Sequence, residues 1–263
     1  DPRYEDYWRT FHKIMERKGV SPDAARTIVR TNTTVIAALM VYRGEADTMI
    51  CGTYGQYTWH LRYILDVIGK AEGVRDCSAL STVILPSGTF FFCDTHISRH
   101  PSAKELVEMT EMACKAVKRF GEIPKVALLS HSNFGSATSE SPIKMAEATR
   151  ILRETLPDIE IEGEMHADTA LNEELRLRIF PNSRLKGQAN LLIFPTLDAA
   201  NSAFNLVKVL GEGISVGPIL MGAAKPVHIV TPSITVRGLV NMSAVAVVDA
   251  HVASKQEKAK PPT

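Results

Sequence analysis

Two stretches of the chain carry side chains suited to holding an anionic ligand. In residues 52–62, two glycines precede Arg62, whose planar guanidinium can make paired hydrogen bonds to phosphate oxygens. In residues 130–141, SHSNFGSATSES, Ser130 and Ser132 precede a predicted helix, where hydroxyls and backbone N–H groups can hold a phosphate. This second stretch lacks the GxxxxGK[ST] pattern, so it is not a P-loop.

Each of these stretches also has an ordinary structural interpretation. Arg62 could pair with Asp66 four residues later on a helix surface, and the Ser-rich stretch could be a simple turn. Four aromatic residues crowd the neighbourhood of Arg62: Tyr54, Tyr57, Trp59 and Tyr63. They could stack on an adenine, although aromatic clusters more often serve packing or an interface.

Other polar residues give weaker signals. Asp94 and His96 have no third ligand nearby in sequence, so they are predicted to end a strand, and no metal site is expected. His228 lies within an apolar run and is typical of a packed histidine, although it could serve as a base. The four cysteines have no CxxC spacing, which indicates reduced thiols of a cytosolic protein.

The elements that position these residues follow from hydrophobic periodicity and from glycine and proline punctuation. The first half is predicted to contain helices 4–18, 32–43, 58–68 and 102–120, with a helix after Pro22, a strand at 48–51 and a hairpin of strands 77–85 and 89–94. From Lys125 onward, strands 126–130, 159–162 and 190–194 alternate with helices 145–156, 168–179 and 198–210. This alternation predicts a parallel sheet with right-handed crossovers. A Gly217-Pro218 turn, the apolar run 227–230 and a closing helix 235–250 complete the chain.

The composition narrows the possible partners. The formal net charge of +1, with acids and bases interspersed, gives no electrostatic footprint for nucleic acid. No apolar run approaches the roughly 18–20 residues of a membrane span, and no signal-peptide pattern is present, so we expect a cytoplasmic protein without a membrane partner. The charged end of the chain, residues 255–263, is predicted to be disordered.

The closing region carries a recognisable frame of glycines and prolines. Gly217, Pro218, Leu220, Gly222, Pro226 and Val227 fit a G-P-x-L-x-G-x-x-x-P-V pattern. Upstream, FPTLDAANSAFNLVKVL fits a second pattern that includes Asn201. Together these residues resemble the phosphate acetyltransferase (phosphotransacetylase) family over nearly all of residues 1–250. The resemblance implies that Asn201, or Asn205 farther along the helix, is a cleft-facing amide, although helix capping or packing is an equal alternative. It also implies that Arg62 contacts phosphate or a CoA thioester.

The catalytic positions of that family are not kept. Where the family has a Ser-Arg pair and a following Asp, this chain has Thr231, Pro232 and Gly238. A chain that keeps the family's glycine and proline pattern but not its catalytic residues resembles the C-terminal regulatory domain of bacterial NADP-dependent malic enzymes. The resemblance then implies acetyl-CoA as an effector, with no catalytic residue, metal or cofactor in this chain, and NADP with a divalent metal in a separate domain. It also implies a homo-oligomer, at least a dimer. The alternative is a working acetyltransferase, with acetyl-CoA and phosphate as substrates.

The predicted fold class is α/β, with two open-sheet α/β/α lobes and a cleft between them, as the resemblance to the isocitrate and isopropylmalate dehydrogenase type of fold implies. The first lobe would comprise residues 1–124 and 226–254, and the second residues 125–225. Because ligands bind outside the carboxyl ends of strands in open α/β sheets, loops 52–62, 130–141 and 226–235 are expected to line this cleft. Arg62, Ser130, Ser132, Asn201 and Thr231 are therefore the predicted contacts to acetyl-CoA.

Overall fold

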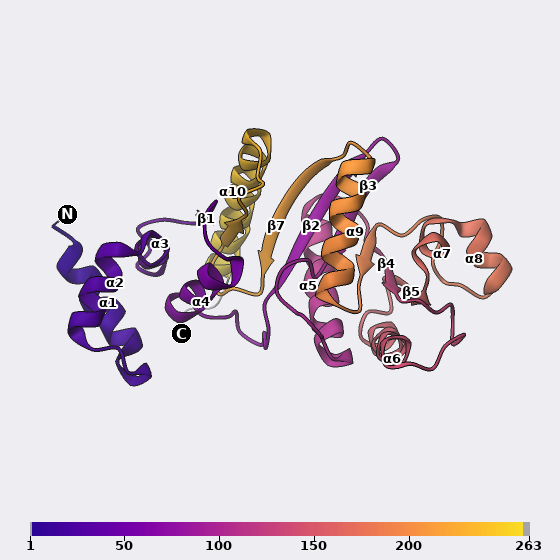
Figure 1. Ribbon diagram of the computed structural model, residues 1–263, viewed down its shortest axis with the longest axis horizontal. Coiled ribbons are helices and arrows are strands. Elements are labelled where there is room, and N and C mark those ends of the chain that lie inside the picture. Colours follow the sequence, from indigo (N-terminus) through magenta and orange to yellow (C-terminus); the bar gives the residue numbers. More distant parts are fainter. Residues whose placement is uncertain (1, 260–263) are drawn as a thin grey trace. The chain divides into compact units, whose positions relative to one another are not determined.

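The computed structural model describes residues 2–259, and the chain divides into two compact units. Unit 1 combines residues 1–75 with 222–263, and unit 2 is the continuous segment 76–221. The fold is mixed α/β, as the sequence predicted, and both units contain parallel strands (Figure 1).

Unit 1 is mostly helical around a two-stranded parallel sheet. Its elements are α1 (Tyr4–Met15), η1 (Glu16–Lys18), α2 (Pro22–Thr31), α3 (Thr33–Tyr42), β1 (Met49–Gly52), α4 (Tyr57–Val67), β8 (Val227–Val230) and α10 (Val236–Ala259). Short polar residues cap two of these helices, α2 and α3. The Ser21 side chain accepts a hydrogen bond from the Ala24 N–H, with Pro22 at the first helical position, and the Asn32 side chain accepts one from the Val35 N–H.

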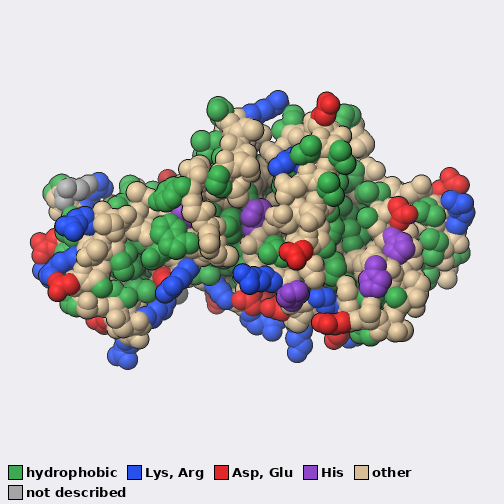
Figure 2. All heavy atoms as spheres, in the orientation of Figure 1, with side chains coloured by type: hydrophobic (Ala, Val, Ile, Leu, Met, Phe, Trp, Pro, Cys, Tyr) green, Lys and Arg blue, Asp and Glu red, His purple; other side chains and the backbone are tan. Residues whose placement is uncertain are grey.

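Helix α10 is held to β1 and β8 by a narrow stripe of residues. Gly238, Met242 and Ala246 recur every four residues and are buried. The opposite side carries exposed valines and a leucine, and Figure 2 shows hydrophobic side chains along this helix. The segment Val236–Lys255 has the length and apolar content of a membrane-crossing helix. A core helix of a folded protein can have the same length and composition, and scattered polar residues interrupt the apolar run here.

Unit 2 is built on a six-stranded mixed sheet in the order β5-β4-β6-β3-β2-β7. Its strands are β2 (Ser78–Leu85), β3 (Gly88–Cys93), β4 (Lys125–Leu129), β5 (Glu160–Met165), β6 (Leu191–Ile193) and β7 (Ile214–Met221). Its helices are α5 (Ala103–Arg119), α6 (Glu140–Thr155), α7 (Ala167–Leu171), α8 (Glu173–Ile179) and α9 (Leu197–Leu210). Strands β3, β6, β4 and β5 are all parallel, whereas β2 is antiparallel to β3 and β7.

The consecutive phenylalanines of β3 show why this sheet is covered on both faces (Figure 1). Phe90 and Phe92 belong to the core cluster that also contains Phe204 of α9. Phe91 points to the other face and meets Phe120, at the end of α5, with ring centroids 5.3 Å apart. All three phenylalanines of β3 are buried, as their run in the sequence predicted.

Four details differ from the expectations. The division falls between Arg75 and Asp76 instead of before Lys125, because β3 pairs directly with β6 and so carries its hairpin into unit 2. Gly217-Pro218 lies within β7, not in a turn; β7 is an edge strand and its register with β2 shifts there, which is a position that tolerates proline.

The other two differences concern helix boundaries. The predicted helix 168–179 is two helices, because Asn172 is extended and caps α8 by accepting a hydrogen bond from the Leu175 N–H. The predicted disordered tail begins too early, because α10 continues to Ala259. Residues 260–263 lie outside the described part of the chain.

Candidate functional site

The carboxyl ends of β1 and β8 bring two of the predicted loops together in unit 1. The strands run parallel in register from Met49 with Val227 to Gly52 with Val230, so residues 53–56 and 231–235 leave the same edge. The approach is very close at Gly52, where an added Cβ would lie 2.0 Å from the carbonyl oxygen of Val230. The glycine in the predicted strand–loop–helix joint is therefore required by backbone contact.

A buried histidine fixes the first of these loops. The two ring nitrogens of His60 lie 2.7 Å from the Tyr54 carbonyl oxygen and 2.8 Å from the Thr34 hydroxyl. On either side of Tyr54, Thr53 adopts φ of 69° and Gly55 φ of 73°; this conformation is ordinary for glycine but uncommon for threonine. Backbone strain held in place by its surroundings is more common at functional sites than elsewhere.

Arg62 lies on α4 and is largely free of protein contacts. Its side chain is 81% exposed, and its Nε is 3.9 Å from the Asp66 carboxylate. Asp66 is engaged more closely by Lys18, at 2.7 Å. The alternative interpretation of Arg62 as an i,i+4 partner of Asp66 thus describes only a long contact, which leaves most guanidinium donors for other groups.

The loop after β8 contains hydroxyl groups but no ionisable side chain from Thr231 to Val236. The hydroxyls of Thr231 and Ser233 lie 3.0 Å apart. The Thr235 hydroxyl accepts a hydrogen bond from the Gly238 N–H, which is the helix cap that the sequence predicted. A side chain at Gly238 would begin 3.0 Å from Ile234, so this turn is also closely packed.

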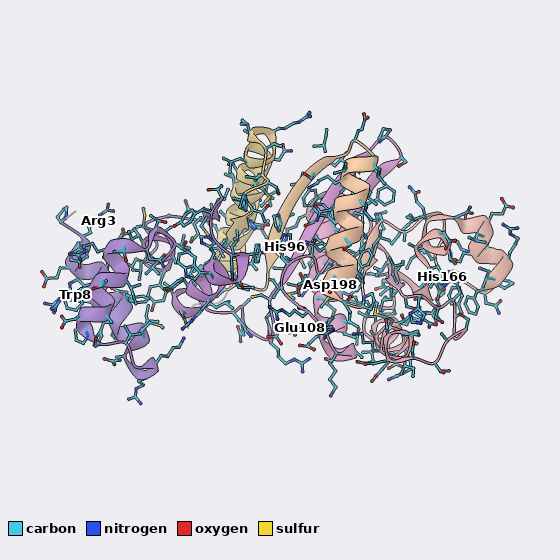
Figure 3. All side chains as sticks on the ribbon, viewed as in Figure 1. Arg3, Trp8, His96, Glu108, His166 and Asp198 are labelled. Carbon is cyan, nitrogen blue, oxygen red and sulfur yellow. The ribbon has the colours of Figure 1, made fainter. Side chains whose placement is uncertain are left out.

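In unit 2 the equivalent edge is formed by four parallel strands. Residues 94–96 follow β3, Ser130 follows β4, His166 follows β5 and Phe194 follows β6, so all of them meet at one side of the sheet. Figure 3 shows His96, His166 and Asp198 on the segments that leave these strand ends. The sequence analysis placed the Ser-rich loop at the carboxyl end of its strand, and its meeting with loops 52–62 and 226–235 stays a prediction.

A buried carboxylate takes the donors of the Ser-rich loop. The Oε1 atom of Glu164 accepts hydrogen bonds from the Ser132 hydroxyl and from the Gly135 N–H, each at 2.7 Å. The Ser132 oxygen in turn accepts from the Ala137 N–H at 3.1 Å, and it is fully buried. The Ser130 hydroxyl accepts from the Ser132 N–H at 2.9 Å. In this conformation the two serines hold the loop, and their contact with a ligand stays a prediction.

The segment after β3 is held by a second buried carboxylate. Asp94 accepts four backbone N–H bonds, from Ala79, His96, Ile97 and Ser98, at 2.9–3.1 Å. Burial raises the pKa of Asp94, and these four N–H groups oppose that rise. Asp94 therefore closes the turn after the strand, in agreement with the structural interpretation of the sequence.

Asn201 lies in α9 and reaches the same turn. Its amide donates a hydrogen bond to the Thr95 carbonyl oxygen at 3.1 Å, and Asn205 donates to the Asn201 side-chain oxygen at 3.2 Å. His96 is mostly buried, and burial together with the positive charge of Lys208 lowers its pKa to about 4. Asn201 thus has the packing role that the sequence left open, while a ligand contact remains a prediction.

The five predicted contacts are divided between the units. Arg62 and Thr231 belong to unit 1, and Ser130, Ser132 and Asn201 belong to unit 2. Within unit 1 the loop that leads to Arg62 and the loop of Thr231 leave one strand edge, and within unit 2 the three others lie on segments at one sheet edge. The shared cleft stays a prediction.

The residues that the sequence analysis missed are those that hold the loops: His60, Glu164 and, in its full role, Asp94. A recoverable signal existed, because a carboxylate at the last positions of a buried strand must find donors nearby. No group of three or more His, Cys, Asp or Glu side chains suited to a metal ion occurs within residues 2–255.

His228 lies on β8, and its ring contacts Asp249 of α10. It is 1% exposed, and its Nε2 lies 3.3 Å from the Asp249 carboxylate, a contact whose angles do not meet hydrogen-bond geometry. This agrees with the packed histidine that the sequence favoured. The pair lies between a strand and a helix within unit 1, not in the loop after β8.

Comparison with known proteins defines the class. Residues 1–247 match the family described as "Phosphate acetyl/butaryl transferase". A phosphate acetyltransferase of Acetivibrio thermocellus is 32% identical over 256 residues, which cover 95% of this chain and 77% of that protein. The chain belongs to this family.

Greater similarity lies with longer proteins. An NAD-dependent malic enzyme of Rhizobium meliloti is 55% identical, and an NADP-dependent malic enzyme of Escherichia coli is 49% identical, each over 95% of this chain. The chain spans about a third of the length of these malic enzymes, 32% and 33% respectively. A phosphotransacetylase from Streptococcus pyogenes has the same fold, with a TM-score of 0.84 and 27% identity over 96% of this chain and 76% of that one.

Proposed function

We propose that this chain is a regulatory domain that binds acetyl-CoA or a related CoA ester and controls a malic enzyme in the same polypeptide. The domain itself does not transfer acetyl groups. Oxidative decarboxylation of malate to pyruvate, with its nicotinamide cofactor and divalent metal, would be performed by a separate domain. We expect the assembled protein to be cytoplasmic.

The observation that carries this proposal is the loop after β8. Acetyl transfer from CoA to phosphate needs a base for proton movement and a charge that stabilises the tetrahedral intermediate. Residues 231–236 are Thr, Pro, Ser, Ile, Thr and Val, so they supply neither a base nor a charge near neutral pH. Loss of one general acid or base typically costs about 10²–10⁴-fold in rate.

The comparisons support the parent protein of this proposal. The malic enzymes of Rhizobium meliloti and Escherichia coli are 55% and 49% identical, against 32% for the phosphate acetyltransferase of Acetivibrio thermocellus. The two malic enzymes differ in the cofactor that their names give, so we keep NADP as the proposed cofactor of the parent and NAD as its alternative.

A working acetyltransferase is the second candidate, and it is favoured by the TM-score of 0.84 to a phosphotransacetylase. An assay that follows acetyl phosphate formation from acetyl-CoA and phosphate separates the two candidates. We expect no turnover above background. Turnover within tenfold of an ordinary enzyme, about 10 per second, would establish the acetyltransferase instead.

Effector binding is tested through Arg62, the exposed cation on α4, the helix that follows the β1 loop. Loss of a charge-assisted hydrogen bond weakens binding by about 1.5–3 kcal/mol, so Arg62→Ala should raise the Kd for acetyl-CoA roughly ten- to a hundredfold. Calorimetric titration gives both values, and Arg75→Ala in the same unit serves as a control for lost surface charge. Equal affinities of the Arg62 variant and the unaltered chain would remove this residue from the site.

We also propose a homodimer that uses the exposed side of α10. Val236, Val240 and Val247 are 85%, 63% and 65% exposed, although a second apolar stripe of this helix is already buried. Light scattering should give a mass near twice 28.9 kDa. Val247→Glu should yield folded monomer, whereas Met242→Glu, in the buried stripe, should yield unfolded protein. A monomer at every concentration of the unaltered chain, with or without acetyl-CoA, would refute this assembly.

A further inference from the structure

The most unusual surface of unit 1 is a cluster of aromatic rings at the start of α4, which we call the aromatic platform: Tyr54, Trp59 and Tyr63. We propose that this platform binds the base of a purine nucleotide. The nucleotide is either the adenosine half of a CoA ester, in which case the inference rests on the proposed function, or a free adenine nucleotide. In both cases a flat heteroaromatic base would stack on an aromatic ring and place its phosphates near the helix start.

The first step of the argument is exposure. Tyr54 is 55% exposed and Trp59 is 37% exposed, and both are large rings that a folded chain normally covers. Trp59 lies 6.3 Å from Tyr54 and 5.1 Å from Tyr63, measured between ring centroids. The rings meet at 56° and 82°, so neither pair is a parallel stack in which both rings lose a face to internal packing.

The second step is rigidity. The Tyr54 carbonyl oxygen is held by the buried His60 ring, and the Tyr54 hydroxyl lies 3.2 Å from the Thr33 hydroxyl. Trp59 packs edge to face with His60 at a centroid distance of 4.8 Å. A platform that is fixed before the ligand arrives loses little conformational entropy on binding. Simple surface packing does not need a loop with Thr53 at φ of 69°.

The third step is position. The platform follows the carboxyl end of the parallel pair β1 and β8, which is where ligands bind in open α/β sheets. On α4, residues 59, 62, 63 and 66 recur at helical spacing, so Trp59, Arg62 and Tyr63 share one side of the helix. Arg62 is 81% exposed there. An aromatic ring next to a guanidinium offers a stacking surface and a phosphate partner together, which matches a nucleotide better than an apolar protein surface.

Tryptophan fluorescence gives a direct readout. The chain has two tryptophans, Trp8 on α1 and Trp59, so Trp8→Phe leaves the platform as the single reporter. Titration of this variant with adenosine 3′,5′-bisphosphate should quench the emission in a saturable way. Unchanged emission at millimolar nucleotide would overturn the proposal.

Affinity measurements then separate stacking from general binding. Loss of one base–aromatic stack should weaken binding of adenosine 3′,5′-bisphosphate and of acetyl-CoA roughly ten- to a hundredfold in Trp59→Ala. Trp59→Phe keeps a ring and should stay within a fewfold of the unaltered chain. Trp59 is 37% exposed and also packs on His60, so Trp59→Ala should keep the native circular dichroism spectrum with a small fall in its thermal unfolding midpoint.

The choice of ligand makes the outcomes distinguishable. Acetyl-pantetheine, which lacks the nucleotide, should bind Trp59→Ala and the unaltered chain alike. If acetyl-CoA binds both chains equally, the platform inference fails while the proposed function stands. If ADP binds with Trp59 dependence but acetyl-CoA does not bind, the platform holds and the proposed function fails. If no nucleotide or CoA ester binds, the platform inference and the proposed function both fail. Binding of a protein partner that depends on Trp59 would also overturn the platform inference.

Discussion

The two strand edges of this chain look similar in sequence but differ in how their polar groups are used. In unit 2, the loops after β3 and β4 are rich in hydroxyls and amides, and two buried carboxylates, Asp94 and Glu164, take up their donors. In unit 1, Arg62 and two rings of the aromatic platform, Tyr54 and Trp59, are exposed beyond the edge of β1 and β8. The edge of unit 2 has many candidate hydrogen-bond donors, but the carboxylates of Asp94 and Glu164 already accept hydrogen bonds from several of them. The guanidinium of Arg62 in unit 1 has only a long contact to a carboxylate.

This difference follows from burial. Because an unsatisfied buried N–H group costs free energy, a chain that buries a polar loop must supply acceptors for it. Carboxylates are strong acceptors, and their presence turns a possible anion site into a closed structural joint. A loop rich in serine and glycine is therefore weak evidence for a phosphate site until the nearby carboxylates are placed.

The largest expected effect tests the closed edge of unit 2 at Asp94. Asp94→Ala removes the acceptor of four backbone N–H groups, so we expect the free energy of unfolding to fall by about 4 kcal/mol. Urea denaturation followed by circular dichroism would measure the loss. Asp94→Asn retains one carbonyl acceptor and should lose about half as much, and a loss below 1 kcal/mol for Asp94→Ala would show that water replaces these bonds.

The second prediction concerns pH at the same edge. Because burial and Lys208 lower the pKa of His96 to about 4 from its ordinary 6.5, the unfolded chain takes up a proton more readily than the folded one between these values. As the pH falls from 6.5 to 4, the protonation of His96 in the unfolded chain should lower the free energy of unfolding by up to about 3 kcal/mol. Below pH 4 this contribution should not change further.

Comparison with variants isolates this contribution from the carboxylates that titrate in the same range. The difference in stability between pH 7 and pH 4 should shrink by that amount in His96→Gln. Lys208→Met removes the positive charge near His96 but leaves His96 buried, so it should reduce the difference in stability between pH 7 and pH 4 only in part. An identical pH profile for His96→Gln and the unaltered chain would show that His96 can be protonated within the folded state.

The third prediction addresses the Ser-rich loop. Glu164→Ala leaves the Ser132 hydroxyl and the Gly135 N–H without their acceptor, and we expect about 2 kcal/mol of destabilisation. Hydrogen exchange at Gly135 should accelerate, since its N–H would open to water. Glu164→Gln, which keeps an acceptor oxygen, should remain near the unaltered chain. Unchanged exchange in Glu164→Ala would mean that the loop does not depend on this carboxylate.

Much of the fold could be predicted from sequence because local rules and long-range packing agree there. The helix expected after Pro22 begins there, with Ser21 as its cap, and the run Phe90–Phe92 is buried on both faces of its sheet. The boundary between the units was placed wrongly because it depends on the pairing of β3 with β6, about a hundred residues apart in sequence. No local pattern reports a pairing of that range.

The candidate site was predicted less completely, for a related reason. Residue type indicated Arg62 and the aromatic cluster, and both are exposed where a ligand can reach them. Residue type also indicated Ser132, but its state depends on Glu164, which is 32 residues away and comes from another strand. The sequence does not reveal whether a serine hydroxyl already has a hydrogen-bond partner in the folded chain. An arginine has five N–H donors, and one neighbouring side chain seldom uses all of them.

The smallest expected effect completes the comparison at the open edge of unit 1. Arg62→Ala removes a side chain that is 81% exposed and whose nearest carboxylate oxygen is 3.9 Å away. Exposed i,i+4 ion pairs contribute about 0.3–0.5 kcal/mol, so the urea midpoint should hardly move. The same substitution is expected to weaken acetyl-CoA binding ten- to a hundredfold, and this contrast is what distinguishes a ligand contact from a structural one. A loss of stability above 1 kcal/mol would place Arg62 among the residues that hold the fold, like Glu164, and the difference between the two edges would disappear.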